Sequence, residues 1–149
     1  TVVVGPNGSG KSTMLRELQK SNDRAALVPQ IPSDLLLTST VAEALVEPQS
    51  RELFEDLVGV FDDQLHPHDL SAGMQLALAI AIQCGSASGL VLLDEPTRGL
   101  DFEAKQKLLG IIQRLDSLGN RVVVATNDEE FIEVLGGVRI QAARGAVLT

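Results

Sequence analysis

The sequence predicts an α/β fold with a mainly parallel sheet flanked by helices, and three observations support this prediction. Short apolar runs alternate with longer stretches of helical period along most of the chain. The first run, residues 1–4, enters a glycine-rich turn that precedes a helical stretch, which is the order strand, loop, helix. A hydrophobic content of 44% with 21% charged residues is typical of a globular domain.

The first half of the chain combines strand and helix signals with a purely helical segment. Residues 12–20 have the period of a helix, and residues 25–29 form a short apolar run that ends at a proline-containing loop. A capping-box spacing begins at Thr40, and apolar residues recur at helical spacing up to Phe61. We therefore expect a small helical insert at about residues 34–70.

The second half returns to alternating helices and strands, with β-branched runs for the strands and an almost wholly apolar first helix. The expected elements are a buried helix over residues 70–84, a buried strand over 90–93, an amphipathic helix over 102–117, a strand over 121–126, a short helix over 128–135, and a hairpin of residues 138–143 and 146–148. The chain, residues 1–149, is thus predicted to form one domain.

Charge and cysteine content disfavour several classes of function. A formal net charge of −8 disfavours a nucleic-acid partner, because phosphate backbones are bound chiefly by Lys and Arg. The single cysteine, Cys84, lies in an apolar stretch and is expected to be buried in a reducing compartment. No apolar run approaches the roughly 20 residues of a membrane helix. His66 and His68 lie in a polar loop and are expected to be solvated.

The strongest motif is a glycine-rich run between the first strand and the first helix. Its residues are Gly5, Pro6, Asn7, Gly8, Ser9, Gly10, Lys11, Ser12 and Thr13, in the pattern of a phosphate-binding loop. Backbone N–H groups of such a loop and the N-terminus of the next helix surround phosphate oxygens. Lys11 would reach the outer phosphates of a nucleotide, and the Ser12 hydroxyl would ligate Mg²⁺. The alternative is a glycine-rich surface turn with an exposed lysine.

Two carboxylates follow directly on the apolar run of residues 90–93. Asp94 is expected to hold Mg²⁺ through its water shell, and Glu95 to be the general base that polarises the water attacking the γ-phosphate. Adjacent side chains point different ways, so one carboxylate can face the metal ion and the other the water. Alternatively, both residues simply end a strand before Pro96. With the phosphate loop, they predict a site that binds and hydrolyses ATP with Mg²⁺.

Three further motifs resemble those of the ABC (ATP-binding cassette) ATPases. Gln30 is similar to the glutamine of the family's Q-loop, which contacts Mg²⁺ and the attacking water and senses the transmembrane partner. Residues 70–75 resemble the signature motif, and Ser71 and Gly73 hold the positions that bind the γ-phosphate of ATP on the opposite subunit. Asp101 ends a run similar to the D-loop, which joins the two sites of a dimer. Ser71 and Asp101 are also suited to be helix N-caps.

The resemblance covers nearly the whole chain and implies a P-loop NTPase core, with the helical insert between Gln30 and the signature motif. It implies an ATPase that converts ATP and water to ADP and phosphate, with ATP and Mg²⁺ bound between two such domains of a homodimer or heterodimer. A transmembrane subunit would couple closure of this dimer to transport, so the domain would be cytoplasmic and peripheral on the inner face of the membrane. Residues 35–45 most resemble importers, particularly the energy-coupling type.

Three positions depart from the family pattern. Asn127 stands where the family has a histidine that hydrogen-bonds the γ-phosphate, and an amide cannot carry a proton or a charge. Ala72 replaces the first glycine of the signature motif, and Met74 shifts its ending. The chain also starts on the strand that enters the phosphate loop, so we expect it to lack the family's earlier β segment, whose aromatic residue stacks on adenine.

These departures keep two alternatives open. Asn127 motivates the hypothesis of a regulatory or degenerate module that binds ATP but hydrolyses little of it. The other alternative is a non-transport ABC ATPase of DNA repair or translation. Relatives of those kinds insert long coiled coils before the signature motif, or carry two cassettes and basic segments, and this sequence shows neither pattern. Powering of a membrane transporter is therefore the leading expectation.

Overall fold

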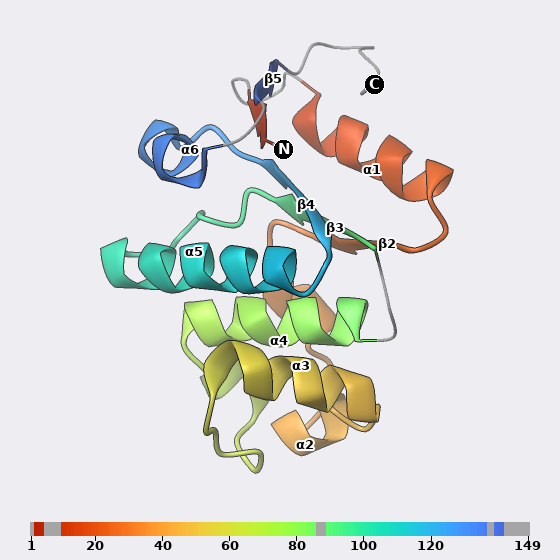
Figure 1. Cartoon of the computed structure of the whole chain (residues 1–149). Helices are drawn as coiled ribbons and strands as arrows, with labels where there is room; N and C mark the ends of the chain where they lie inside the picture. Colours follow the sequence, from red (N-terminus) through yellow and green to blue (C-terminus); the bar gives the residue numbers. More distant parts are fainter. Residues whose placement is uncertain (1, 5–9, 86–88, 137–138, 142–149) are drawn as a thin grey trace.

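The computed structural model describes residues 2–4, 10–85, 89–136 and 139–141. Its elements follow in the order β1 (Val2–Val4), α1 (Lys11–Ser21), β2 (Ala25–Val28), η1 (Pro32–Leu35), α2 (Val41–Ala44), α3 (Pro48–Val58), η2 (Pro67–Asp69), α4 (Ala72–Cys84), β3 (Leu90–Asp94), α5 (Phe102–Ser117), β4 (Arg121–Ala125), α6 (Glu129–Leu135) and β5 (Arg139–Gln141) (Figure 1). The predicted α/β fold with a parallel sheet and flanking helices is confirmed.

The sheet in the described part of the chain has five strands in the order β2-β3-β4-β1-β5, and all neighbours are parallel. In the register of the central strand β3, Leu93 lies opposite Val28 on one side and Asp94 lies opposite Ala125 on the other. Parallel neighbours point the same way, so their carboxyl ends meet at one edge of the sheet. That edge receives the segments that follow β1, β3 and β4.

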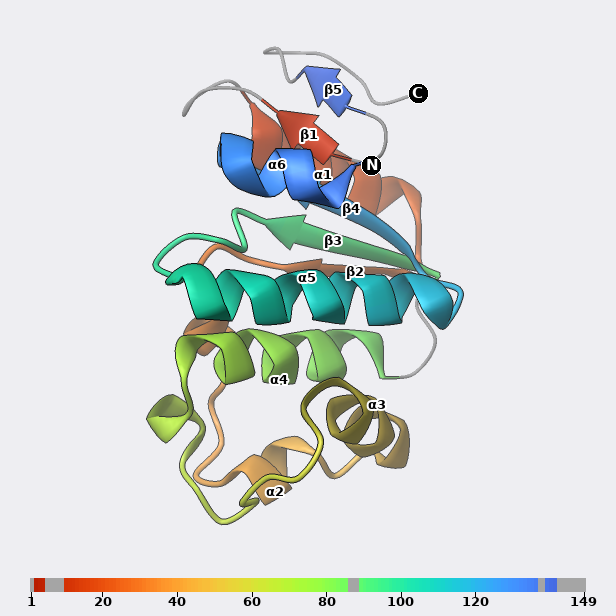
Figure 2. The same cartoon turned by 60° about the vertical axis from the view of Figure 1, so that its left-hand side comes forward.

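Helices cover both faces of the sheet, with α1 on one face and α4 and α5 on the other (Figures 1 and 2). Leu90 and Leu92 of β3 pack in the cluster with α1, while Val91 and Leu93 pack in the cluster with α4 and α5. All four side chains are buried. A strand covered on both faces needs apolar residues at every position, which explains the unbroken apolar run seen in the sequence.

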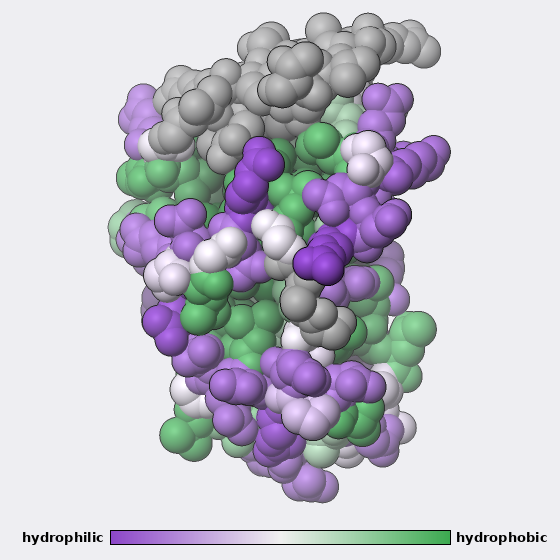
Figure 3. Space-filling view, turned by 45° about the vertical axis from the view of Figure 1, so that its right-hand side comes forward, coloured by the Kyte–Doolittle hydropathy of each residue, from purple (hydrophilic) through white to green (hydrophobic). Residues whose placement is uncertain are grey.

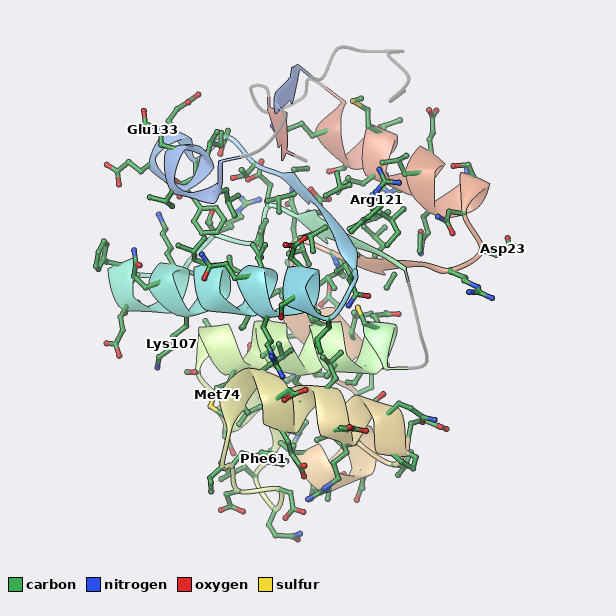
Figure 4. All side chains as sticks on the ribbon, viewed as in Figure 1. Asp23, Phe61, Met74, Lys107, Arg121 and Glu133 are labelled. Carbon is green, nitrogen blue, oxygen red and sulfur yellow. The ribbon has the colours of Figure 1, made fainter. Side chains whose placement is uncertain are left out.

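The segment between β2 and α4 forms a separate helical layer, in which α3 packs against α4 (Figure 1). Helix α3 ends at Val58, and the next residue, Gly59, adopts a φ of +77°. The prediction that the helical segment continues to Phe61 is therefore wrong beyond Val58. A glycine with a positive φ commonly ends a helix, and the prediction relied on the spacing of apolar residues alone. Val60 is exposed, whereas the Phe61 ring packs edge-on against Phe54 near α3, with centroids 4.7 Å apart (Figure 4).

Local hydrogen bonds explain where the first helix of this layer and α4 begin. Thr40 Oγ1 accepts from Glu43 N at 3.1 Å, as a capping box requires, but the Glu43 carboxylate accepts from Ser39 N at 3.2 Å instead of Thr40 N. Helix α4 begins at Ala72 and not at residue 70, because Ser71 is its N-cap residue, whose side chain accepts from Met74 N. Capping by a side-chain oxygen satisfies an N–H group that has no partner inside the helix.

The predictions for Cys84 and the two histidines are confirmed, whereas most of the predicted C-terminal hairpin lies outside the described residues. Cys84 is buried, and His66 and His68 are exposed, as predicted. Strand β5 pairs in parallel with β1, with Val3 opposite Ile140, while residues 142–149, which include most of the predicted hairpin, lie outside the described residues. Among the helices that the structure describes, none combines the length and the hydropathy needed to cross a membrane.

Candidate functional site

The predicted phosphate, metal and base residues all leave the sheet at its carboxyl edge. Gly10 precedes α1 after β1, Asp94 ends β3, and Asn127 follows β4, so neighbouring strands bring these three segments together. Open α/β sheets bind their ligands at this edge. Of the predicted phosphate loop, Gly5, Pro6, Asn7, Gly8 and Ser9 lie outside the described residues.

The described end of the phosphate loop starts α1 in a way that suits an anion. Gly10 is the N-cap residue with a φ of +95°, a left-handed conformation that favours glycine. No side chain caps this helix, and no acidic residue lies in its first turn. The first N–H groups of a helix, here from Lys11, Ser12 and Thr13, have no partner within the helix and carry its positive dipole end. An anion such as a phosphate complements both features.

Ser12 and Asp94 come together although they belong to different elements. Ser12 Oγ donates a hydrogen bond of 2.7 Å to Asp94 Oδ2. The other carboxylate oxygen, Asp94 Oδ1, is buried and has no hydrogen-bond partner among the described residues. A buried carboxylate oxygen normally has a partner, so this atom is suited to a group from outside the chain.

The chemistry of this pair fits Mg²⁺. Hydroxyl and carboxylate oxygens are ligands that Mg²⁺ accepts, and the ion keeps several waters and binds substrate phosphates in addition. In the described ranges, no three His, Cys, Asp or Glu side chains gather into a metal site of their own. A site with few protein ligands is what an ion shared with a nucleotide requires. Ser12 and Asp94 are therefore the described residues best placed to hold it.

Lys11 and Glu95 form the second pair of the site. Lys11 Nζ lies 3.5 Å from Glu95 Oε1, and the two side chains are only 6% and 9% exposed. Glu95 Oε1 is buried and accepts no hydrogen bond among the described residues. Two buried opposite charges stabilise each other, and either one alone would be costly in a poorly hydrated place.

The backbone of Glu95 is unusual. Its φ of +46° is the left-handed region, and Glu95 is the one residue other than glycine in that region within the described chain. Glu95 N donates a 2.7 Å hydrogen bond to Ala125 O of the neighbouring strand β4, which fixes the chain as it leaves β3. Strained backbone of this kind is often found at functional sites. The turn directs the Glu95 and Asp94 side chains to different partners.

The end of β4 is held against the segment after β3. Thr126 is fully buried, and its Oγ1 lies 3.5 Å from Thr97 Oγ1 and accepts from Asp128 N at 3.1 Å. Lys105 Nζ of α5 lies 2.6 Å from Asp128 Oδ2. The hydrogen bond from Lys105 outweighs the effect of burial and holds the pKa of Asp128 below its ordinary value of 3.8. These contacts fix both sides of Asn127.

A cavity of about 340 Å³ opens where these segments meet. It is lined by Glu95, Thr97, Arg98, Asn127 and Asp128. The predicted general base and the residue at the histidine position therefore face the same space. This arrangement can place a polarising carboxylate and a hydrogen-bond donor around one substrate group.

Gln30 has a partner that the sequence did not indicate. Its Oε1 accepts a hydrogen bond of 2.8 Å from the Arg98 guanidinium. In the described chain the predicted Mg²⁺ ligand Gln30 is thus bound to a cation of the protein, and it forms no hydrogen bond with Ser12 or Asp94.

The predicted signature and D-loop residues begin two helices. Ser71 Oγ accepts from Met74 N at 3.3 Å and caps α4, and Asp101 Oδ1 accepts from Ala104 N at 2.8 Å and caps α5. At Gly73 an added Cβ would lie 3.9 Å from the Ala104 side chain, so α4 and α5 are close there. Helices α1 and α4 lie on opposite faces of the sheet, so the phosphate loop and the signature motif begin helices on different faces (Figures 1 and 2).

Sequence reasoning missed Arg98 and Lys105 as parts of this site. Arg98 lies between the predicted carboxylates Asp94 and Glu95 and the predicted D-loop residue Asp101, and this position was the available signal. Lys105 lies in the first turns of α5, four residues after the N-cap Asp101. No sequence motif connects it with Asp128.

Comparisons with known proteins agree on the kind of domain. Residues 19–133 match the protein family described as "AAA domain, putative AbiEii toxin, Type IV TA system". A protein of Streptomyces coelicolor named "Putative ABC transporter ATP-binding protein" is 36% identical over 178 residues, which covers 98% of this chain and 32% of the relative. The energy-coupling factor transporter ATP-binding protein EcfA of Carboxydothermus hydrogenoformans is 29% identical and covers 95% of this chain and 68% of the relative.

Solved structures show the same fold. The structure of cbiO1 from Clostridium perfringens, described as part of the ABC transporter complex cbiONQ, has a TM-score of 0.79 at 19% identity and covers 99% of this chain and 74% of that one. The dimeric structure of MJ0796, described as a bacterial ABC transporter cassette, has a TM-score of 0.71 at 22% identity, with 98% and 82% of the two chains covered. The chain thus spans most of these cassettes but only 32% of the Streptomyces coelicolor relative.

Proposed function

Since the chain belongs to this AAA-domain family of P-loop NTPases and is an ATP-binding domain of the ABC type, we propose that it binds and hydrolyses ATP to power an ABC membrane transporter. The observation that carries the proposal is the hydrogen bond from Ser12 to Asp94, with the buried Asp94 Oδ1 left for an outside group. A merely structural pair at the end of a strand would not leave a buried carboxylate oxygen without a partner.

The phosphates of ATP bind at the N-terminus of α1 in this proposal. Lys11 exchanges its contact with Glu95 for the outer phosphates, and the positive end of α1 supports the same charge. Ser12 and Asp94 hold Mg²⁺, with Gln30 as a further ligand. The bound ion would supply neutralisation of phosphate charge during hydrolysis.

Glu95 is the proposed general base. When Lys11 turns to the phosphates, the Glu95 carboxylate becomes available to a water molecule in the cavity beside Asn127. The water oxygen attacks the γ-phosphorus, its proton passes to Glu95, and the bond to the bridging oxygen breaks with release of ADP and phosphate. Asn127 donates a hydrogen bond to the γ-phosphate in this arrangement, without the charge that a histidine could carry.

The proposed partners are a second ABC ATPase domain and a transmembrane subunit. Ser71, Gly73 and Asp101 lie at the starts of α4 and α5, on the face of the sheet opposite α1, and suit contacts with the nucleotide of a second domain in a homodimer or heterodimer. The domain would then be cytoplasmic, at the inner face of the membrane through its partner.

Several exposed apolar side chains lie in the segment after Gln30, where the family resemblance expects the transmembrane partner to dock. Ile31, Leu37, Val46 and Val60 are more than half exposed, on or next to the helical layer. On the face drawn in Figure 3 the apolar areas are separate islands in a mainly hydrophilic surface. Apolar residues scattered singly are normal on a protein surface, so the proposed contact with a transmembrane partner of the energy-coupling importer type rests on the similarity to EcfA and not on this surface.

A second candidate function rests on Asn127. A regulatory or degenerate module would hold ATP at the same Lys11 and Ser12 but turn it over slowly, because an amide cannot share a proton at the γ-phosphate. The same residues bind the nucleotide in both cases, so only turnover separates the two candidates.

The test is steady-state ATPase activity of the purified chain with Mg²⁺, compared with Glu95→Gln and Asn127→His, and with Lys11→Ala as the binding-deficient control. Turnover by the wild type that Glu95→Gln removes supports a working ATPase. Turnover only in Asn127→His supports the degenerate module. Equal turnover in the wild type and Lys11→Ala would contradict both candidates, because a contaminating enzyme would then account for the activity.

A further inference from the structure

The side chains of Gln30 and Arg98 form a link between the segment after β2 and the segment after β3. Arg98 Nη1 donates a 2.8 Å hydrogen bond to Gln30 Oε1. Within the described residues, no ion pair engages Arg98, so its charge is met by a neutral amide. A guanidinium pairs best with a carboxylate, and an amide oxygen therefore holds it only weakly.

The strand register places this link beside the catalytic edge. Val28 lies opposite Leu93, and both chains continue for two residues to reach Gln30 and Glu95 respectively. Arg98 N donates to Glu95 O at 3.2 Å, which turns the chain back toward the edge. Arg98 lines both the cavity of Glu95 and Asn127 and a second hollow of about 320 Å³ lined by Gln30. Arg98 thus borders both the cavity of the general base and the hollow of Gln30.

One atom of Gln30 has two competing uses. The side-chain oxygen Oε1 is the atom that accepts from Arg98, and it is also the single side-chain atom of Gln30 that can ligate a cation. If both bound at once, the guanidinium and a divalent ion would be neighbours on one oxygen, and their like charges would repel each other. Gln30 can therefore serve one cation at a time.

We propose that Arg98 is a positioning residue that holds Gln30 Oε1 and competes with the divalent cation of the nucleotide site for it. This inference rests on the proposed function, because it concerns the ion that accompanies ATP. Binding of Mg²⁺ with nucleotide releases Gln30 from Arg98, and loss of the ion restores the link. The state of the site is thereby coupled to the position of the segment that begins with Ile31 and Pro32 and leads into the helical layer.

The test measures Mg²⁺-dependent binding of a fluorescent, non-hydrolysable ATP analogue to the purified chain, with no turnover involved. Arg98→Ala frees Gln30, so the Mg²⁺ concentration for half-maximal binding falls by roughly three- to tenfold, the size expected for one ordinary exposed hydrogen bond. Arg98→Lys keeps a cationic donor and gives a smaller fall. Affinity for the analogue in EDTA is unchanged, because Gln30 acts through the ion. Arg114→Ala is the matched control, since Arg114 is an exposed arginine paired with Asp56 on the helical layer.

A double variant isolates the link itself. In a Gln30→Ala background, Arg98→Ala has no further effect on the Mg²⁺ dependence. An unchanged Mg²⁺ dependence in Arg98→Ala alone overturns the inference while the proposed function stands. Weaker binding of Arg98→Ala in EDTA also overturns it, because Arg98 would then contact the nucleotide directly. Failure of the wild type to bind the analogue at any Mg²⁺ concentration is a failure of the proposed function.

Discussion

Lys11 Nζ of α1 and Glu95 Oε1 after β3 lie 3.5 Å apart, with both side chains buried. The two charges come from segments distant in sequence, and parallel strands bring them to the same edge of the sheet. Each group neutralises the other, and each also has a proposed role toward ATP. The pair therefore links the stability of the fold to the chemistry of the site.

Replacement of Lys11 by alanine is expected to affect both stability and binding. The buried Glu95 carboxylate loses its cation, which costs about 3 kcal/mol of unfolding free energy. Nucleotide binding is lost as well, because the point charge for the outer phosphates is gone. Urea unfolding and equilibrium binding of an ATP analogue measure the two effects separately.

A second substitution tests the cause of that instability. Glu95→Gln in the Lys11→Ala background removes the unpaired charge and is expected to recover more than half of the lost free energy, without recovery of nucleotide binding. No recovery in the urea midpoint would show that the ion pair is not the source of the cost.

Ser71→Asp separates helix capping from contact with phosphate. Asp and Ser are equally good N-caps, so the unfolding free energy should change by less than about 0.5 kcal/mol. If Ser71 contacts the γ-phosphate on a second domain, the added negative charge repels it and lowers ATPase activity at least tenfold. Activity is measured at a protein concentration where ATP-dependent dimers form in gel filtration.

The control for this prediction is Thr40→Asp, which exchanges the N-cap of α2 in the helical layer. It is expected to leave both stability and ATPase activity nearly unchanged. Wild-type activity in Ser71→Asp would show that Ser71 caps α4 and does not contact the γ-phosphate.

The site residues that belong to short sequence motifs could be predicted, and the contacts between residues on different elements could not. Two short motifs predicted four site residues: the phosphate loop predicted Lys11 and Ser12, and the carboxylate pair at the end of a strand predicted Asp94 and Glu95. Their roles toward ATP stay predictions, although the structure brings the four side chains into two pairs.

The links of Arg98 with Gln30 and of Lys105 with Asp128 required the structure. Each joins residues on different elements, and the distance between such residues depends on sheet order and helix packing rather than on sequence spacing. The end of α3 was misjudged for the opposite reason: the apolar spacing continued to Phe61, but the local conformation of Gly59 ended the helix.

Gly85→Ala tests the packing that attaches the helical layer to the core. An added Cβ would overlap Ser50 Oγ and lie 2.7 Å from Ser50 Cα of α3, and a backbone atom cannot move aside cheaply. We expect a loss of about 2 kcal/mol or more in unfolding free energy, as for other overpacked sites.

Gly110→Ala on α5 is the matched control, because nothing lies within 4 Å of its added Cβ in the described structure. There the higher helix propensity of alanine should raise stability by about 0.5–1 kcal/mol. Opposite signs for the two glycines in urea unfolding would support the close contact at Gly85, and a gain at both would contradict it.

Asp128 is expected to make the fold sensitive to acid. Lys105 holds the pKa of Asp128 below 3.8 in the folded protein, so the folded state favours the charged carboxylate. A lowered folded pKa contributes stability that is present above the unfolded value of about 3.9 and is lost as the pH falls through the folded pKa. Asp128→Asn keeps an N-cap for α6 but removes the charge, and should cost about 1 kcal/mol at pH 7 and progressively less as the pH falls through the lowered folded pKa of Asp128. Urea midpoints across this pH range measure the difference, with Asp116→Asn, an exposed carboxylate, as the control. Equal losses at pH 7 and in acid would show that the ion pair with Lys105 does not stabilise the loop that carries Asn127.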